Sequence, residues 1–327
     1  MGLDPLRVLI VGCGNIAGLF DQERSHYDFP YTHAGAYSQD ERFTLAACVE
    51  PDDNRRSEFM AAWNVPVGYR TIDEVLDSEN HFDVISICSP TEYHAQDLEI
   101  SLRLKPKLIF CEKPITPSLM ETERLVNKCR NNGILLAVNY SRRFDPDILR
   151  LQDAIRDERW GQLRSVVGIY NKGIMNNGSH MLDLLNMLVP PINIVTVGKP
   201  VYDFFPNDPT IPVWLEASNG VPVHIVCGHA VDYAIFELQL IFSLGVLTME
   251  EGGMFWRERQ AKDSITHKGY RVVDEGTHRA GEYPQVMLKA IDNIYGAIYH
   301  GKPLASTGES AISAQRTCEL IKKKACE

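Results

Sequence analysis

The sequence predicts an α/β protein in which a doubly wound parallel sheet is followed by an α+β domain with a large, mostly antiparallel open sheet. Three observations predict this fold class. Strands alternate with helices up to residue 139, a glycine turn directly follows the first strand, and short strands with turns dominate the rest of the chain. With 327 residues, the chain is long enough for two domains, which we place at residues 1–139 and 140–327.

The composition is that of an ordinary globular protein and argues against several other classes. Hydrophobic residues make up 44% and charged residues 23%, which indicates neither disorder nor a membrane protein. Apolar runs are too short to span a bilayer and no secretory leader opens the sequence, so we expect a cytoplasmic protein. The net charge of −10, with scattered lysines and arginines, argues against nucleic acid as a partner. The eight cysteines show no C-x-x-C pair or zinc spacing, so we expect reduced thiols and no metal site.

A short apolar run at residues 8–11 is typical of a strand buried on both faces, and a glycine turn follows it. Gly12 and Gly14 take the first two positions of a G-x-G-x-x-G/A pattern. The first glycine permits the tight turn and the second lets the backbone approach a pyrophosphate. We expect a helix to start near Asn15 and Ile16, where its N–H groups would hold the phosphates. The pattern predicts a dinucleotide site, with an ordinary strand-to-helix turn as the alternative.

An acidic residue ends the second apolar strand, residues 44–49. Glu50 stands where dinucleotide sites place a carboxylate that accepts hydrogen bonds from the adenosine ribose hydroxyls. Its separation from the glycines exceeds the usual spacing because a polar interval, residues 21–32, is inserted. Glu50 would repel a 2′-phosphate, which favours NAD. Arg55 and Arg56 leave NADP open, unless they only form a solvated helix face.

The alternation then continues to the end of the first domain. A capping box at Thr71–Glu74 and another at Ser118–Glu121 predict helix starts. Further strands are expected at residues 83–88, 108–111 and 134–138. Helices between these strands would make the sheet parallel and doubly wound.

Polar residues follow two of these strands at the edge where a parallel sheet binds its ligands. Ser89, Pro90 and His94 follow the first, and Glu112 with Lys113 follow the second. A lysine at this edge can donate to a substrate hydroxyl or carry charge beside the nicotinamide ribose. Partial burial would lower its pKa towards use as an acid or base. Most lysines are solvated charges and most helix-start histidines are structural, which are the alternatives here.

The second domain is predicted to contain helices packed on an antiparallel sheet. Asn219-Gly220 predicts a hairpin between two of its strands. The expected helices cover residues 149–159, 179–188, 283–299 and 306–321, and the expected strands cover residues 213–217, 221–227, 234–242 and 246–250.

A second group of candidate residues surrounds the helix start at residue 179. His180 and Asp183 lie three residues apart and would share a helix face, and Asn176 precedes them. The imidazole could reach a bound ligand, or it could only cap or pack. A Ser-His-Asp hydrolase is not indicated, because the chain has no G-x-S-x-G elbow.

Taken together, these motifs resemble the glucose-fructose oxidoreductase/inositol dehydrogenase/rhizopine catabolism (Gfo/Idh/MocA) family. The resemblance covers nearly the whole chain, and the motifs stand in family order. They are the glycine turn, Ser-Pro-x-x-x-His, Glu-Lys-Pro, Asn-Tyr-Ser-Arg-Arg-Phe and x-x-Gly-x-His-x-x-Asp.

The resemblance implies a Rossmann domain followed by an open sheet that commonly serves as the subunit interface, hence a homodimer or homotetramer. It implies hydride transfer between a nicotinamide and a carbon of a sugar, polyol or sugar derivative. By motif position, Lys113 would be the active-site lysine and His180 the active-site histidine. Family members often carry aspartate where this chain has Asn176. Asparagine can orient a hydroxyl but exchanges no proton, so the base would be His180 or Lys113.

Two further residues are substrate-binding candidates. Lys172 lies in a segment that resembles those near the substrate pocket of members acting on activated sugars, and it would meet a phosphate or carboxylate. Arg143, in the motif that leads out of the first domain, is the other. Both have plain structural alternatives.

Two other functions remain open. Some relatives bind dinucleotide without turnover, so a sensor or regulator is one alternative, which the presence of both Lys113 and His180 argues against. A glycosidase that oxidises its substrate transiently with NAD is the other. The sequence does not choose among substrates, since one hydroxyl more or less decides specificity.

Overall fold

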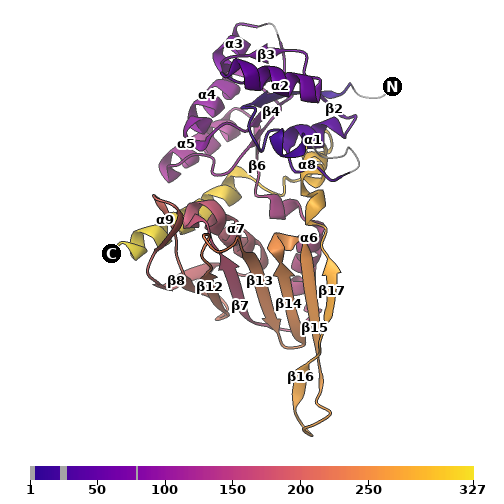
Figure 1. The fold of residues 1–327 in the computed structure, drawn as a ribbon, viewed down its shortest axis with the longest axis vertical. Helices are drawn as coiled ribbons and strands as arrows, with labels where there is room; N and C mark the ends of the chain where they lie inside the picture. The colour runs from indigo at the N-terminus through magenta and orange to yellow at the C-terminus, as the bar shows by residue number, and fades with distance from the viewer. Residues whose placement is uncertain (1–3, 23–27, 79) are drawn as a thin grey trace. The chain divides into compact units, whose positions relative to one another are not determined.

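The computed structural model describes residues 4–22, 28–78 and 80–327, and these fold into two units (Figure 1). The first unit contains residues 1–144 and 284–312, and the second contains residues 145–283 and 313–327. This division differs from a single boundary after residue 139, because residues 284–312 return to the first unit.

The described part of the first unit is built on a six-stranded sheet in the order β3-β2-β1-β4-β5-β6, with every pairing parallel. The order reverses between β1 and β4, so the carboxyl ends of these two strands form the switch point at which doubly wound sheets bind ligands. The Rossmann-like prediction is confirmed. The strands are β1 (Leu6–Val11), β2 (Phe43–Val49), β3 (Gly68–Tyr69), β4 (Val84–Ile87), β5 (Leu108–Cys111) and β6 (Leu135–Val138).

Helices of both short and ordinary length accompany these strands, and all but the helix at Val286–His300 and the turn at Ser141–Phe144 lie between two of them in the chain. Side chains at Thr32, Asp52, Thr71 and Ser118 cap four of them, and the last two belong to the expected capping boxes. The helices are α1 (His33–Ser38), α2 (Asp53–Trp63), α3 (Ile72–Leu76), α4 (His94–Leu104), α5 (Leu119–Asn131) and α8 (Val286–His300), with short 3-10 turns at Leu19–Asp21, Thr91–Tyr93 and Ser141–Phe144.

The prediction of a helix start near Asn15 was wrong, since the structure has no α-helix within residues 12–22. The glycine turn leads instead into one loose turn, and Gly18 leaves it with φ −170° and ψ −22°, which are not helical. Gly18 packs so closely on Trp63 and Phe59 that a side chain would not fit. The first α-helix starts only at His33, whose backbone nitrogen donates to Ile16 O (3.1 Å).

The second unit is built on a nine-stranded sheet, and β12 and β7 are its parallel neighbours within an otherwise antiparallel order. This confirms the predicted large, mostly antiparallel sheet. Its strands are β7 (Leu163–Tyr170), β8 (Ile192–Val197), β11 (Val213–Ala217), β12 (Pro222–Cys227), β13 (Phe236–Phe242), β14 (Gly245–Glu250), β15 (Phe255–Asp263), β16 (Arg271–Val273) and β17 (Thr277–Ala280).

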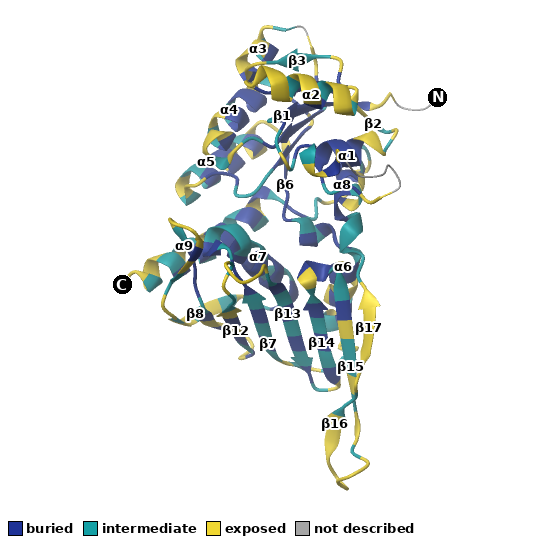
Figure 2. Ribbon diagram, in the orientation of Figure 1, coloured by how far each residue is buried: buried dark blue, intermediate teal, exposed yellow. Residues whose placement is uncertain are grey.

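Three helices cover one face of this sheet: α6 (Pro146–Arg156), α7 (Ser179–Leu188) and α9 (Gly308–Ala325), of which α9 crosses into this unit after residue 312 (Figure 1). Asp145 caps α6 and Pro146 occupies its first turn, which places its start three residues earlier than expected. Figure 2 shows buried residues alternating with less buried ones along the central strands. The buried set joins the helices in one core that includes Leu151, Met181, Leu238 and Ile321.

A separate two-stranded hairpin, β9 (Val201–Phe205) with β10 (Asp208–Thr210), belongs to the second unit. Between β7 and α7 the chain forms a π-helix, η4 (Gly173–Gly178). Short π-helical segments are frequent at functional sites, and this one carries Asn176.

Candidate functional site

The glycine turn after β1 lies against the loop after β4. Gly12 has φ +86°, and a Cβ there would lie 2.6 Å from the backbone nitrogen of Ser89. At Gly14, by contrast, no described atom beyond its chain neighbours lies within 4 Å of where a Cβ would be. Asn15 is exposed and Ile16 half-buried. The turn therefore has the tight geometry and the open backbone that a pyrophosphate requires.

Glu50 lies at the end of β2, and its carboxylate reaches the glycine turn. Its Oε2 accepts a hydrogen bond from the backbone nitrogen of Cys13 (3.0 Å), and its Oε1 accepts one from that of Asp52 (3.2 Å). Arg55 Nη1 lies 3.5 Å from Oε1, and Arg56 donates to the carbonyl oxygen of Glu50 (2.6 Å). The structure thus places the acidic side chain beside the turn, as a ribose-binding role requires.

His94 joins two loops at the carboxyl edge of the sheet. Its buried ring has Nε2 2.8 Å from Ser89 O and Nδ1 2.9 Å from Pro114 O. Ser89 Oγ donates to Asp97 (2.5 Å), while Pro90 is exposed. Burial raises the pKa of Asp97, although the hydrogen bond from Ser89 and the nearby His94 oppose this. The contacts of His94 make it a tie between the loop after β4 and the loop after β5.

Glu112 is a fixed negative charge next to Lys113. Its Oε1 lies 3.0 Å from His33 Nε2 and accepts a hydrogen bond from Asn139 Nδ2 (2.6 Å), and its Oε2 accepts one from the backbone nitrogen of Lys113 (3.3 Å). Burial opposes ionisation, but the contacts with His33 and Asn139 and the charge of Lys113 outweigh it and hold the pKa of Glu112 below its usual range. The carboxylate therefore fixes the loop from which the half-buried Lys113 extends.

In the second unit, Asn176 and His180 lie one turn apart where η4 passes into α7. Asn176 Nδ2 donates to the carbonyl oxygen of Lys172 (3.1 Å), and its own carbonyl oxygen accepts from Ser179 Oγ (2.8 Å). His180 is half-buried and Asp183 is buried. The structure thus brings Lys172, Asn176 and His180 into one segment.

The two remaining candidates differ in their surroundings. Lys172 has φ 65° and ψ 42°, a left-handed conformation, and its Nζ lies 5.2 Å from the ring centre of Phe204. Arg143 belongs to the first unit, where its Nη1 donates to Ala305 O (3.3 Å).

A cavity of about 460 Å³ lies beside the Asn176 to His180 segment. Burial and the charges of Glu250 and Glu251 raise the pKa of Glu237, which faces it. The cavity is lined by Asn177, Ala234, Ile235, Phe236, Glu237, Glu251 and Gly252. Carboxylate and amide groups of this kind can bind hydroxyl groups.

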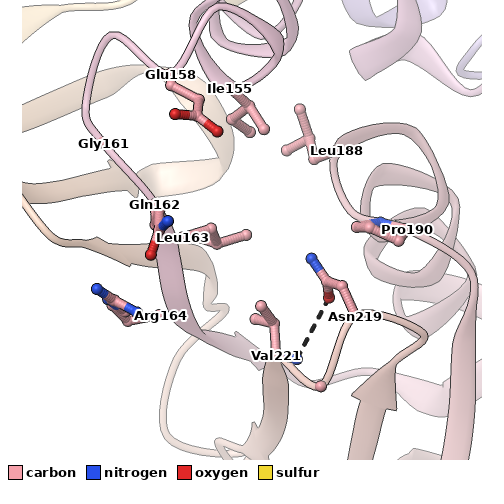
Figure 3. A pocket seen from close by; sticks show the side chains of 11 residues that line it. Ile155, Glu158, Gly161, Gln162, Leu163, Arg164, Leu188, Pro190, Asn219 and Val221 are labelled. Atoms are coloured by element: carbon pink, nitrogen blue, oxygen red, sulfur yellow. Dashed lines mark hydrogen bonds between the residues drawn. The ribbon is translucent and has the colours of Figure 1, made fainter.

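A second cavity, of about 500 Å³, lies at the opposite end of β7 (Figure 3). Leu163 and Arg164, at the start of β7, line it together with Leu188 and Asn219. An eight-residue strand is roughly 26 Å long. This cavity therefore lies far from Asn176 and His180, and it contains none of the predicted site residues.

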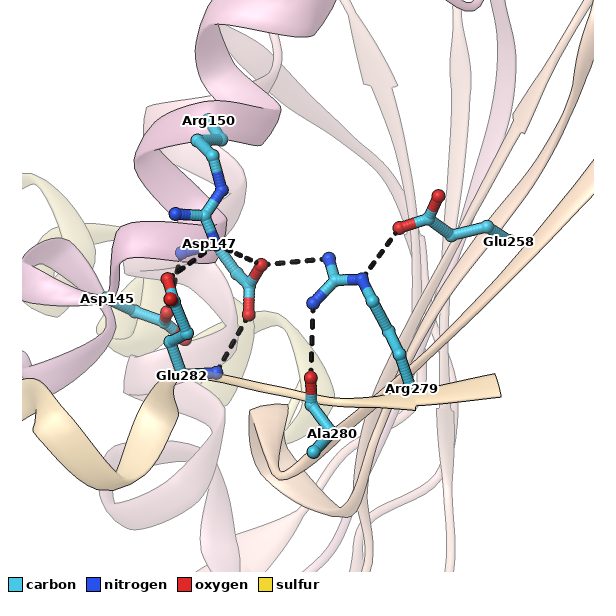
Figure 4. Close-up of polar contacts among 7 residues, drawn as sticks. All are labelled: Asp145, Asp147, Arg150, Glu258, Arg279, Ala280 and Glu282. Atoms are coloured by element: carbon cyan, nitrogen blue, oxygen red, sulfur yellow. Dashed lines mark hydrogen bonds and ion pairs between the residues drawn. The ribbon is translucent and has the colours of Figure 1, made fainter. Parts of the chain in front are cut away.

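A buried carboxylate also organises the start of α6 (Figure 4). Asp147 accepts hydrogen bonds from Arg150 (2.6 Å), Arg279 (2.8 Å) and the backbone nitrogen of Glu282 (2.8 Å), and Arg279 also pairs with Glu258 (2.9 Å). Burial opposes ionisation of Asp147, but these donors hold its pKa below the usual range. The network ties α6 to β15 and β17, so its role is structural.

Sequence reasoning missed five polar residues that fix these loops: His33, Asp97, Asn139, Asp203 and Asp208. Asp97 follows His94 by three residues on one helix face, which is a usable signal. Asp203 interrupts the apolar run Val-Tyr-Asp-Phe-Phe, which is a weaker one.

The described residues contain no group of three or more His, Cys, Asp or Glu side chains placed to hold a metal ion. Across the same residues, no helix combines the length and apolar character needed to cross a membrane.

The chain is similar to known oxidoreductases over most of its length. Residues 6–140 match the oxidoreductase family with an NAD-binding Rossmann fold, Gfo/Idh/MocA. An inositol 2-dehydrogenase of Rhizobium meliloti is 31% identical over 318 residues, which cover 90% of this chain and 93% of that one. The uncharacterized oxidoreductase YrbE of Bacillus subtilis is 40% identical over 79 residues, or 24% of this chain and 23% of that relative.

The fold agrees with these matches. A crystal structure described as a putative NADPH-dependent oxidoreductase from Desulfitobacterium hafniense has a TM-score of 0.79 at 17% identity, covering 99% of this chain and 96% of that one. The chain therefore belongs to the Gfo/Idh/MocA oxidoreductase family, and its first unit is an NAD-binding Rossmann domain.

Proposed function

We propose that the protein is an NAD-dependent oxidoreductase that moves a hydride between the nicotinamide and a carbinol or keto carbon of a sugar, polyol or nucleotide-linked sugar. The observation that carries the proposal is the hydrogen bond from Cys13 N to Glu50 (3.0 Å), because it fixes an acidic acceptor at the glycine turn. The family relationship to an inositol 2-dehydrogenase supports the substrate class.

The residues of the first unit fit a dinucleotide. The open backbone at Gly14 would face the pyrophosphate, and Glu50 would accept from the adenosine ribose hydroxyls. NAD is favoured over NADP because Glu50 would repel a 2′-phosphate, and because Arg56 is already held by Glu50 O and by Asp53 (2.5 Å). The bound cofactor supplies the hydride acceptor or donor.

The chain's own residues would handle the proton and the substrate. We propose Lys113 and His180 as the groups that hydrogen-bond the reacting hydroxyl and exchange its proton, with Asn176 as an orienting group. Glu112 keeps a negative charge beside Lys113, and it fixes the loop from which the lysine extends by accepting a hydrogen bond from the backbone nitrogen of Lys113 (3.3 Å). The cavity beside Asn177 would bind other hydroxyls of the substrate.

We also propose that the protein forms a homodimer or homotetramer through the face of the nine-stranded sheet that α6, α7 and α9 do not cover. This face carries exposed apolar side chains on neighbouring strands, with Trp214 at 41% and Val226 at 42% exposure.

Single substitutions test the two proposed proton-exchanging groups. Lys113→Ala and His180→Ala should each lower turnover by about 10²- to 10⁴-fold, because each removes a proton-exchanging group. Lys324→Ala, at an exposed position of the last turn of α9, is the matched control and should keep wild-type turnover. If both active-site variants turn over substrate as fast as the wild type, the proposed roles are wrong.

A further inference from the structure

Side chains of the β9–β10 hairpin form hydrogen bonds with the backbone of the segment that carries Lys172, Asn176 and His180. Asp203, which is 5% exposed, accepts hydrogen bonds on Oδ2 from the backbone nitrogens of Lys172 (3.1 Å) and Ala230 (3.1 Å). Its Oδ1 accepts from Thr210 Oγ1 (2.7 Å). Asp203 therefore fixes the residue at which the chain turns left-handed into η4.

Asp208 holds the next turn of the same segment. Its Oδ1 accepts from the backbone nitrogen of Met175 (2.9 Å), and its Oδ2 accepts from that of Asn176 (3.0 Å). Thr210 Oγ1 accepts from the backbone nitrogen of Gly173 (2.8 Å). Hairpin side chains thus bind four of the N–H groups at the start of the helical segment, where such groups have no partner within the helix.

The contact between Asp208 and the segment is close and specific. Gly173 has φ +88°, and a side chain at this position would collide with the Asp208 carboxylate. A carboxylate at the start of a helix also interacts favourably with the positive end of the helix dipole. The hairpin is itself anchored, because Lys322 of α9 donates to Asn207 O (2.6 Å).

The same contacts explain why the chain has asparagine at 176. Its Nδ2 donates to the carbonyl oxygen of Lys172 (3.1 Å), which the acceptor-only carboxylate of aspartate could not do. An aspartate at position 176 would also place a second negative charge near the Asp208 carboxylate, which already binds the backbone nitrogen of this residue.

We propose that Asp203 and Asp208 are positioning residues, which hold η4 and the first turn of α7 so that Asn176 and His180 are correctly placed for the substrate. The proposal rests on the proposed roles of those two residues. The hairpin then acts on the reaction through the backbone of the segment, without contact with the reacting atoms.

A double-mutant cycle with His180 tests this proposal. Asp208→Ala should lower kcat/KM for the sugar or polyol by about 10- to 100-fold, because small displacements of catalytic groups have effects of this size. The Kd for NAD should not change, since the hairpin belongs to the other unit. In a His180→Ala background, Asp208→Ala should have a clearly smaller effect on turnover, namely the part that acts through Asn176. Asp208→Asn, which keeps one oxygen acceptor, should recover part of the loss. Asp157→Asn, at an exposed carboxylate that follows the last residue of α6, is the control.

Amide hydrogen exchange provides a readout that does not depend on activity. Exchange at Met175 and Asn176 should accelerate in Asp208→Ala and stay unchanged in Asp157→Asn. The proposal is overturned if Asp208→Ala matches the control in kcat/KM, or if its effect is as large without His180 as with it. A wild-type rate in His180→Ala alone would instead contradict the proposed role of His180, so the two failures are distinguishable.

Discussion

Single residues account for the cofactor side of the site. Gly12 is required for two separate reasons, its φ of +86° and the 2.6 Å approach of Ser89 N to the place of a Cβ. The glycine pattern in the sequence predicts the tight turn and its positive φ. The close approach of Ser89 depends on the loop after β4, which is distant in the chain, and is not predicted by the pattern.

Gly12→Ala should therefore weaken NAD binding at least tenfold, because the turn must shift away from Ser89. It should also lower the free energy of unfolding by about 1–3 kcal/mol through backbone strain. Titration of the purified protein with NAD measures the first effect. Gly133→Ala is the matched control, since Gly133 has φ +69° but no described neighbour within 4 Å of its Cβ position. NAD affinity equal to that of the control would show that the turn tolerates a side chain.

The residues that sequence reasoning found are those with a local pattern. Gly12, Gly14, Glu50 and Lys113 each follow a strand that is recognisable from its apolar run. Asp208 has no such pattern, because it binds backbone nitrogens 32 and 33 residues earlier in the chain. Partners at that separation are decided by tertiary folding, which one sequence does not display.

At the scale of elements, periodicity and capping residues predicted most helices and many strands, but no strand at residues 163–170 or beyond residue 250, where the structure has β7, β15, β16 and β17. The helix expected after the glycine turn was wrong, because the buried Asp21 accepts hydrogen bonds there from the backbone nitrogens of Tyr31 (2.9 Å) and Thr32 (2.8 Å). These long-range bonds, together with the close packing of Gly18, replace the expected helix by a turn. The π-helix η4 was not predicted either, because side chains of the distant hairpin bind the backbone nitrogens at its start.

The network around Asp147 makes the stability of the second unit depend on pH. The pKa of Asp147 is lower in the folded protein than its ordinary 3.8, so its ionised form stabilises the fold above about pH 4. This contribution is lost as the pH falls through the lower, folded pKa. Asp147→Asn should reduce the free energy of unfolding by about 1–3 kcal/mol near neutral pH, because its charge-assisted hydrogen bonds are weakened while Arg279, which is 41% exposed, keeps its pair with Glu258.

Urea unfolding followed by tryptophan fluorescence measures this effect, since Trp160, Trp214 and Trp256 lie in the second unit. The difference between wild type and Asp147→Asn should be constant from pH 5 to 8 and shrink below about pH 4. Asp157→Asn should show neither effect, because its ion pairs are exposed. A difference that persists unchanged at pH 3 would contradict this assignment.

At the scale of the whole molecule, the sequence predicted the folds of both units but not the return of residues 284–312 to the first unit. Helix α8 is amphipathic, and its apolar face alone does not show which core it joins. In the structure Asn139 Nδ2 donates to Met287 Sδ (3.7 Å), and Ala137 forms a β-bridge with Thr307. These contacts return residues 284–312 to the first unit.

The proposed subunit interface is also a property of the whole molecule. Val226→Glu places a charge on the uncovered sheet face, where it should shift the protein towards the monomer at a given concentration. Light scattering measures the mass, and Val231→Glu, at a 78% exposed loop position, is the control. An unchanged mass for Val226→Glu would move the interface elsewhere.

The most direct test of the central claim is the formation of reduced nicotinamide from NAD and NADP across a panel of free sugars, inositols and nucleotide-linked sugars. The account predicts reduction with at least one of these compounds and a higher kcat/KM with NAD than with NADP. Silence across the panel, with NAD binding demonstrated in the same samples, would contradict it and favour a sensor or a glycosidase that recycles its cofactor.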